Sequence, residues 1–386
     1  MEIKVARSAS RITPFLAMEV MERAEELKAQ GKDIILLCLG EPDFPTPEPV
    51  IEGAVVAMKS GNTAYTHSLG RIELREAIVE HYRRRYGVAI TTEQVIVSSG
   101  TSPLMLLLFA SLLDEGDEII LSDPSYACYP NFIRFLGGET VFLRTREEDG
   151  FQPRPEEVKK LVGPKTRGVL INSPSNPAGS VLPTAWLEEL SSLPVPLISD
   201  EIYHGLTYEG EERSVLEFTS EAFVLGGFSK TYAMTGWRLG YLIAPPSSVR
   251  TLQSLHQNFL ICANSFVQCA GVTALRECDD YVARMRQAYD QRRKYTLQGV
   301  RRLGLGVGKE PTGAFYVLAD ARHISRDSLS LAKKILEETG VALTPGIDFG
   351  EGAEGYLRFS YSNSIENIGR AFDRLEEWFR KKGFLK

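Results

Sequence analysis

The sequence lacks the features that mark membrane-spanning, secreted and metal-binding proteins. No apolar run approaches the roughly 20 residues that a membrane-spanning helix needs, and the first residues lack the apolar core of a signal peptide. The five cysteines are odd in number and form no C-x-x-C pair, and the five histidines show no metal-ligand spacing. We therefore expect a cytoplasmic protein without a membrane span, a disulfide framework or a metal site.

The sequence also has no excess of positive charge. Lysine and arginine number 44 against 50 acidic residues, the net charge is -6, and no segment is rich in basic residues. This balance excludes the basic surface that holds a phosphodiester backbone, so nucleic acid is not an expected partner. A chain of 386 residues is too long for one ordinary core, which predicts two domains.

The middle of the chain repeats short apolar runs that are followed by Gly, Ser, Asp or Pro and often by a helical stretch, which is typical of α/β architecture. The seven expected strands are residues 95–98, 118–121, 140–143, 168–171, 196–199, 222–225 and 240–244. Their nearly continuous apolar character predicts one mostly parallel sheet with helices on both faces. Ligands of such sheets bind beyond the strand ends.

The C-terminal part of the chain predicts a smaller α+β domain. It contains expected strands at 314–318 and 356–361 and an amphipathic helix at 364–382. The long charged helix expected at 279–302 marks the boundary between the domains. We predict a large domain at 45–285 and a small domain at 286–386. The N-terminal segment 1–44 fits either domain on the sequence alone, and we assign it to the small one.

One lysine stands in an unusual setting. Lys230 follows the expected strand 222–225 and begins a run that reads KTYAMTGWRLGY. A lone lysine after a strand is ordinarily solvent-exposed. Here Arg238 lies eight residues further on, close enough through a turn to bind a phosphate as a planar, permanently charged donor.

Three further segments follow expected strands. Asp200 ends one strand in the run ISDEIY, where a helix N-cap is the plainer interpretation. Asn176 lies in the loop NSPSNPAG, which turn chemistry alone would explain. Gly100, Thr101 and Ser102 precede a helical stretch, so their backbone N–H groups form either an ordinary helix cap or a phosphate site.

These segments, with the run GEPDFPTP that begins at Gly40, closely resemble class I/II aminotransferases, the aspartate aminotransferase superfamily of fold type I pyridoxal phosphate enzymes. The resemblance covers the chain from about Arg11 to Phe379 in the order and spacing of the family. One departure is Gly227, where many members have a serine that donates to the cofactor phosphate. The resemblance implies a fold type I transferase that carries pyridoxal 5'-phosphate (PLP).

The resemblance also implies roles for individual residues. Lys230 would hold PLP as an aldimine and carry the proton between the amino acid Cα and the cofactor, and Asp200 would keep the ring nitrogen protonated. Tyr203 and Asn176 would hydrogen-bond the ring oxygen, and Tyr126 would stack on the ring, against a plainer interpretation as core packing. The implied phosphate ligands are Gly100, Thr101, Ser102, Ser229, Arg238 and, from the neighbouring subunit of a homodimer with shared active sites, Tyr65.

The resemblance also implies which residues contact the substrate. Arg358 alternates with apolar residues on the strand 356–361 and matches the arginine that holds the α-carboxylate bidentately. Gly40, Asn176 and Phe15 would also contact the substrate. The implied activity is ping-pong transfer of an amino group from an L-amino acid to a 2-oxo acid. A carbon–sulfur lyase on the same scaffold stays open as the alternative.

The donor side chain is predicted from missing positive charge. Ser102 stands where some aspartate-using relatives have a lysine, and the run that follows Pro14 is apolar. A neutral or aromatic donor is therefore expected, although the sequence does not rule out aspartate. The same apolar run is equally compatible with an ordinary helix start.

Overall fold

The computed structural model describes residues 3–385, and its centre is a seven-stranded sheet. In spatial order the strands are β2 (Val95–Ser98), β8 (Gly240–Ile243), β7 (Phe223–Gly227), β6 (Leu197–Asp200), β5 (Thr166–Asn172), β3 (Glu118–Asp123) and β4 (Glu139–Arg144). All neighbours from β7 to β4 are parallel, whereas β8 runs antiparallel to both β7 and β2. The predicted mostly parallel α/β sheet is confirmed, and every predicted strand end lies within two residues of the observed one.

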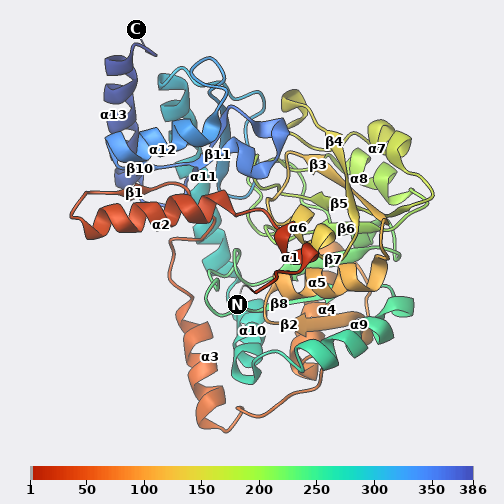
Figure 1. The fold of residues 1–386 in the computed structure, drawn as a ribbon. Coiled ribbons are helices and arrows are strands. Elements are labelled where there is room, and N and C mark those ends of the chain that lie inside the picture. Colours follow the sequence, from red (N-terminus) through yellow and green to blue (C-terminus); the bar gives the residue numbers. More distant parts are fainter. Residues whose placement is uncertain (1–2, 386) are drawn as a thin grey trace.

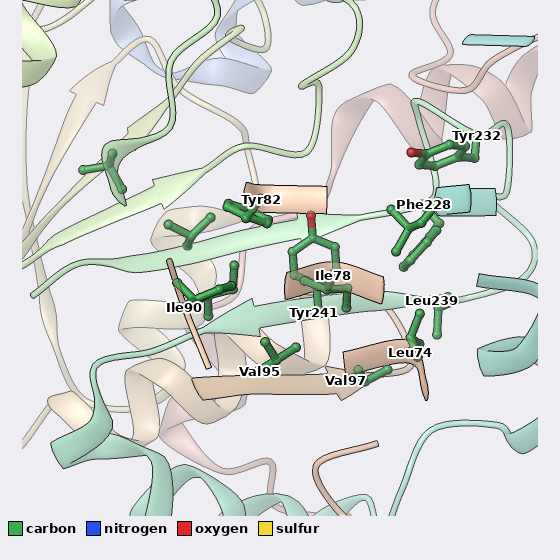
Figure 2. Close-up of a cluster of buried hydrophobic side chains, with 14 of the residues drawn as sticks. Leu74, Ile78, Tyr82, Ile90, Val95, Val97, Phe228, Tyr232, Leu239 and Tyr241 are labelled. Carbon is green, nitrogen blue, oxygen red and sulfur yellow. The ribbon is translucent and has the colours of Figure 1, made fainter. Parts of the chain in front are cut away.

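Helices cover both faces of this sheet, as the apolar strands predict (Figure 1). One face carries α3 (Glu48–Lys59), α4 (Ile72–Tyr86), α7 (Pro155–Leu161), α8 (Thr184–Ser191) and α10 (Ser265–Glu277). The other carries α5 (Thr101–Leu112), α6 (Tyr129–Phe135) and α9 (Pro246–Phe259). Ile120 faces the first group, and its neighbours Ile119 and Leu121 face the second. Figure 2 shows the first face, where Ile78 and Tyr82 of α4 pack over β2 and β8.

A second, three-stranded antiparallel sheet has the order β11 (Thr344–Pro345), β12 (Tyr356–Ser360) and β9 (Tyr316–Asp320). It packs with α11 (Asp279–Arg302), α12 (Ser328–Thr339) and α13 (Ile365–Lys382). The expected strand at 314–318 is placed two residues too early. Ala314 has a left-handed φ of 54°, and its N–H donates to Leu206 O, so it cannot continue the strand ladder.

The N-terminal segment lies mostly against this second group of elements, but residues 7–13 contact α6, which covers the large sheet. It forms α1 (Arg7–Ser10), α2 (Leu16–Ala29) and β1 (Ile35–Leu36), and β1 pairs in parallel with β10 (Val341–Ala342). Five short 3₁₀ helices complete the described part of the chain: η1 (Thr92–Gln94), η2 (Glu147–Asp149), η3 (Val215–Glu217), η4 (Gly346–Phe349) and η5 (Glu351–Ala353). The domain limits at 44 and 285 stay a prediction, and residues 1, 2 and 386 of those domains lie outside the described residues. None of the helices within 3–385 is long and apolar enough to cross a membrane.

Candidate active site

A cavity of about 360 Å³ opens beyond the carboxyl ends of β2, β5, β6 and β7. Because parallel strands end at the same edge of the sheet, segments far apart in the sequence meet there. The predicted residues that line it are Phe15, Gly40, Thr101, Ser102, Tyr126, Asn176, Asp200, Tyr203, Ser229, Lys230, Arg238 and Arg358. Two of the predicted residues do not line the cavity. Gly100 lies behind Arg238, and Tyr65 is 81% exposed outside the cavity.

Lys230 follows β7 and points into the cavity. Its Nζ donates to Gly40 O at 2.6 Å. Burial lowers the pKa of Lys230 to about 8; Glu41 opposes this shift, and the positive charges of Arg238 and Arg358 add to it. The amine is therefore far more often unprotonated, and so nucleophilic, than that of a solvated lysine.

Asp200 ends β6 at the floor of the cavity and is 4% exposed. Its Oδ2 accepts from Tyr129 Oη at 2.7 Å, and its Oδ1 accepts from Ile202 N at 3.1 Å. Burial raises the pKa of Asp200 to about 6, while these two hydrogen bonds oppose the shift. The helix N-cap interpretation is wrong, because turns follow Asp200 and its side chain closes a local turn instead.

Arg358 is 2% exposed and has no salt bridge within residues 3–385. Its Nη1 donates to Asn176 Oδ1 at 2.8 Å, and its Nη2 donates to Cys38 O at 2.6 Å and Thr344 Oγ1 at 3.1 Å. The buried Nε has no hydrogen-bond partner. A buried guanidinium without a counter-charge is costly unless a ligand supplies an anion. The geometry therefore favours a carboxylate beside Arg358.

A second anion position lies at the N-terminus of α5, whose first N–H groups have no partner within the helix. Arg238 Nη2 lies so close that a Cβ built on Gly100 would meet it at 2.7 Å. Gly100 also has a left-handed φ of 98°, and its N–H already donates to Ser98 O. Its part is therefore to leave room for Arg238, while Thr101 and Ser102 face the cavity.

Aromatic and apolar side chains enclose the rest of the cavity. Tyr126 meets Phe15 and Tyr129 edge-on, with ring centroids 5.9 and 5.2 Å away. Tyr203 Oη lies 2.8 Å from Tyr316 Oη. Sequence reasoning missed Tyr129 and Tyr316, because single tyrosines outside a motif carry no local signal. It also missed Met21, Cys38 and Met105 as lining residues.

Comparisons with known proteins identify the family of the chain. A family model described as aminotransferase class I and II matches residues 32–375. The aspartate/prephenate aminotransferase of Thermus thermophilus is 39% identical over 96% of this chain and 97% of its own length. The (5-formylfuran-3-yl)methyl phosphate transaminase of Methanocaldococcus jannaschii is 39% identical over 95% and 97%.

Solved structures agree as well. Aspartate aminotransferase from Thermus thermophilus with maleate has a TM-score of 0.93 and 39% identity, covering 97% of this chain and 100% of that one. A family model that spans most of the chain, and relatives that align with nearly all of it, establish the family. The chain belongs to the class I and II aminotransferases and is an aminotransferase.

Proposed function

We propose that this chain binds PLP covalently at Lys230 and transfers an amino group from an L-amino acid to a 2-oxo acid by a ping-pong reaction in a homodimer. The observation that carries the proposal is that Lys230 and Arg358, which has no salt bridge within residues 3–385, face one cavity. A nucleophilic amine and a carboxylate receptor in the same cavity are what an amino-acid substrate requires.

The described residues fit PLP as a ligand. Arg238 and the N-terminus of α5 form an anion position of the kind that a phosphate group occupies. Asp200, buried and fixed by Tyr129, suits a cationic ring nitrogen, because a nearby positive charge favours the ionised carboxylate. Tyr126 offers an aromatic face, and Asn176 offers amide groups for the ring oxygen.

PLP, when bound, supplies an electron sink that stabilises negative charge on the amino-acid Cα. Residues of the chain would bind the substrate, orient it and move the proton. Arg358 holds the α-carboxylate and so fixes which Cα bond faces Lys230. The Lys230 amine would accept the proton from the amino-acid Cα as a general base and would return it as a general acid. Asp200 would favour the protonated form of the ring nitrogen.

The donor side chain should be neutral. Lys230, Arg238 and Arg358 are the cations among the described cavity walls, and each already has a role. Apolar side chains line the entrance from α2, and the first two N–H groups of that helix are held by Asp348 at 2.7 and 3.1 Å. Relatives differ in the substrates that their names give, from aspartate and prephenate to valine and pyruvate.

A homodimer is supported by exposed apolar side chains on one surface. Tyr65 is 81% exposed, and Phe259 and Ile261 are 69% and 48% exposed. The N–H of Thr66 lies 3.4 Å from Cys262 Sγ, which brings the segment around Tyr65 beside Ile261. An apolar patch of this kind is typical of a subunit interface. Tyr65 would then extend toward the partner's cofactor phosphate.

Two measurements on the purified protein test the proposal. Borohydride reduction of the PLP-loaded protein should fix one PLP per chain, detected by mass, and Lys230→Ala should abolish this while the exposed control Lys165→Ala retains it. In the second measurement, an amino acid is added to unreduced PLP-loaded protein without an acceptor. It should yield one equivalent of 2-oxo acid, after which the reaction should stop. Continuing release of pyruvate and ammonia would instead indicate the carbon–sulfur lyase, and unchanged labelling of Lys230→Ala would refute the assignment of the lysine.

A further inference from the structure

A second cavity of about 320 Å³ lies behind the active-site cavity and shares no lining residue with it. Residues that are adjacent in the sequence line the two different cavities. Asp200 and Lys230 line the first cavity, while their neighbours Glu201 and Thr231 line the second. The walls come from α4, the start of α11 and the ends of β7 and β8.

Glu201 provides an unsatisfied acceptor inside this cavity. It is 3% exposed, and its Oε1 accepts from Ser199, Ser214 and the N–H of Val215 at 3.0 to 3.1 Å. Its Oε2 is buried and has no hydrogen-bond partner. His204 Nδ1 lies 3.5 Å away but is engaged by Tyr86 Oη at 2.7 Å. A buried carboxylate oxygen without a donor is costly and indicates a missing ligand.

The other acidic side chains of the cavity are already neutralised. Glu212, beside the cavity, pairs with Arg85 at 2.6 Å, and Asp279 pairs with Arg84 at 3.2 Å. Burial lowers the pKa of His81 to about 4, so that imidazole is uncharged at neutral pH. Arg286 is exposed at the cavity edge and has no ion pair within residues 3–385. The cavity therefore has inside it one carboxylate oxygen without a hydrogen bond, with His204 as its nearest basic group, and at its edge one arginine without an ion pair within residues 3–385.

Aromatic rings form much of the wall of this cavity. Figure 2 shows four of them, Tyr82, Phe228, Tyr232 and Tyr241, on the α4 side of the sheet. Electron-rich aromatic faces attract organic cations, and they also pack against apolar or aromatic ligand groups. The volume of about 320 Å³ suits a molecule of amino-acid size.

We propose that this cavity is a second ligand site that binds a small zwitterion, with its ammonium group on Glu201 Oε2 among the aromatic rings and its carboxylate toward Arg286. An α-amino acid has this chemistry. Binding here does not depend on PLP or on Lys230, so the proposal stands apart from the function proposed above. Its position one residue from both Asp200 and Lys230 gives a ligand a short physical route to the active site.

The test is a calorimetric titration of the PLP-loaded protein with N,N-dimethyl-L-phenylalanine. This tertiary amine keeps one ammonium N–H and a carboxylate but cannot condense with an aldehyde. Glu201→Gln and Arg286→Gln should each raise the dissociation constant at least tenfold, because each removes one charged contact. Ala283→Trp, on an exposed position of the lining, should block the cavity and abolish binding.

Controls separate the two cavities. Arg284→Gln removes an exposed charge two residues from Arg286 that does not line this cavity, and it should leave the titration unchanged. Arg358→Gln removes the carboxylate receptor of the active site and should leave the second-site affinity unchanged. If Glu201→Gln does not fold, the two surface variants Arg286→Gln and Ala283→Trp still test the proposal. Absence of binding at millimolar ligand, or binding that all three cavity variants retain, overturns the proposal.

Discussion

Arg358 on β12 donates through Nη1 to Oδ1 of Asn176, in the loop after β5, at 2.8 Å. The hydrogen bond joins the small antiparallel sheet to the large sheet across the cavity. Asn176 is in turn fixed, because its N–H donates to Asn172 Oδ1 at 2.8 Å. The guanidinium of Arg358, the proposed carboxylate receptor, is therefore held in place before any substrate arrives, which reduces the entropy cost of binding.

Arg358→Lys should raise KM for every amino-acid donor and lower kcat/KM by about 100-fold, ~2.7 kcal/mol. A lysine offers one ammonium in place of a planar fork, so it cannot serve Asn176, Cys38 O and a substrate carboxylate together. PLP content, measured by absorbance after gel filtration, should stay normal. A KM close to that of the unmodified protein would show that the carboxylate binds elsewhere.

Attachment of PLP to the cofactor-free chain should depend on pH through Lys230. Only the unprotonated amine attacks an aldehyde, and burial lowers the pKa of this amine from 10.5 to about 8. The rate should therefore rise with pH up to about 8 and level off above it, because protonation removes the nucleophile below that value. Stopped-flow absorbance measures the rate, and a midpoint near 10.5 would contradict the lowered pKa.

The sequence predicted the large sheet well because its strands are fully buried. A near-continuous apolar run such as the one in β3 is typical of a strand that is covered on both faces. The sequence pattern therefore matches the observed burial of these strands. It did not predict the pairing of β1 with β10, since each has two residues and joins segments about 300 positions apart. Such pairing depends on the completed fold.

In the candidate site, too, the sequence predicted some residues and missed others. Lys230, Asp200, Asn176 and Arg358 stand in motifs whose order along the chain is informative, and all four line the cavity. The partners that fix them are single residues brought in by tertiary structure, such as Tyr129 on Asp200 and Thr344 on Arg358. No local pattern marks a residue whose role is one hydrogen bond to a distant side chain.

Asp200→Asn should retain covalently attached PLP but lose turnover by about 10³-fold, ~4 kcal/mol in barrier. An amide cannot hold a proton on the ring nitrogen, so the electron sink weakens. Tyr129→Phe serves as a matched control, because it removes one hydrogen bond from Asp200 and leaves the carboxylate in place. Its rate should fall far less. Near-normal turnover of Asp200→Asn would contradict the assigned role.

The exposed surface around Tyr65 should be buried in a dimer in solution. The combined change Phe259→Asp and Ile261→Asp places two charges on this apolar patch and should yield a monomer with weaker PLP binding. Phe142→Asp, on an exposed position of β4, is the control and should stay dimeric. Light scattering measures the mass. A fully active monomer of the unmodified protein at micromolar concentration would exclude a shared site.

Neutral amino acids should be better donors than aspartate, and the reason is the balance of charge around the cavity. Arg358 is the proposed receptor of the α-carboxylate, and the acidic Glu41 also lines the cavity. A distal carboxylate placed against Phe15 and Met21 would be buried without a cation, at a cost of several kcal/mol.

An alkyl or aromatic side chain gains roughly 0.8 kcal/mol per buried CH₂ on the same surface. Values of kcat/KM for aspartate, alanine, leucine and phenylalanine with one fixed acceptor measure the difference. Ser102→Lys restores a cation at the mouth of the cavity and should shift the preference toward aspartate by about tenfold, ~1.4 kcal/mol, with little change for alanine. If the unmodified protein already prefers aspartate by that factor, a cation from the partner subunit must complete the site, and the neutral-donor prediction is wrong.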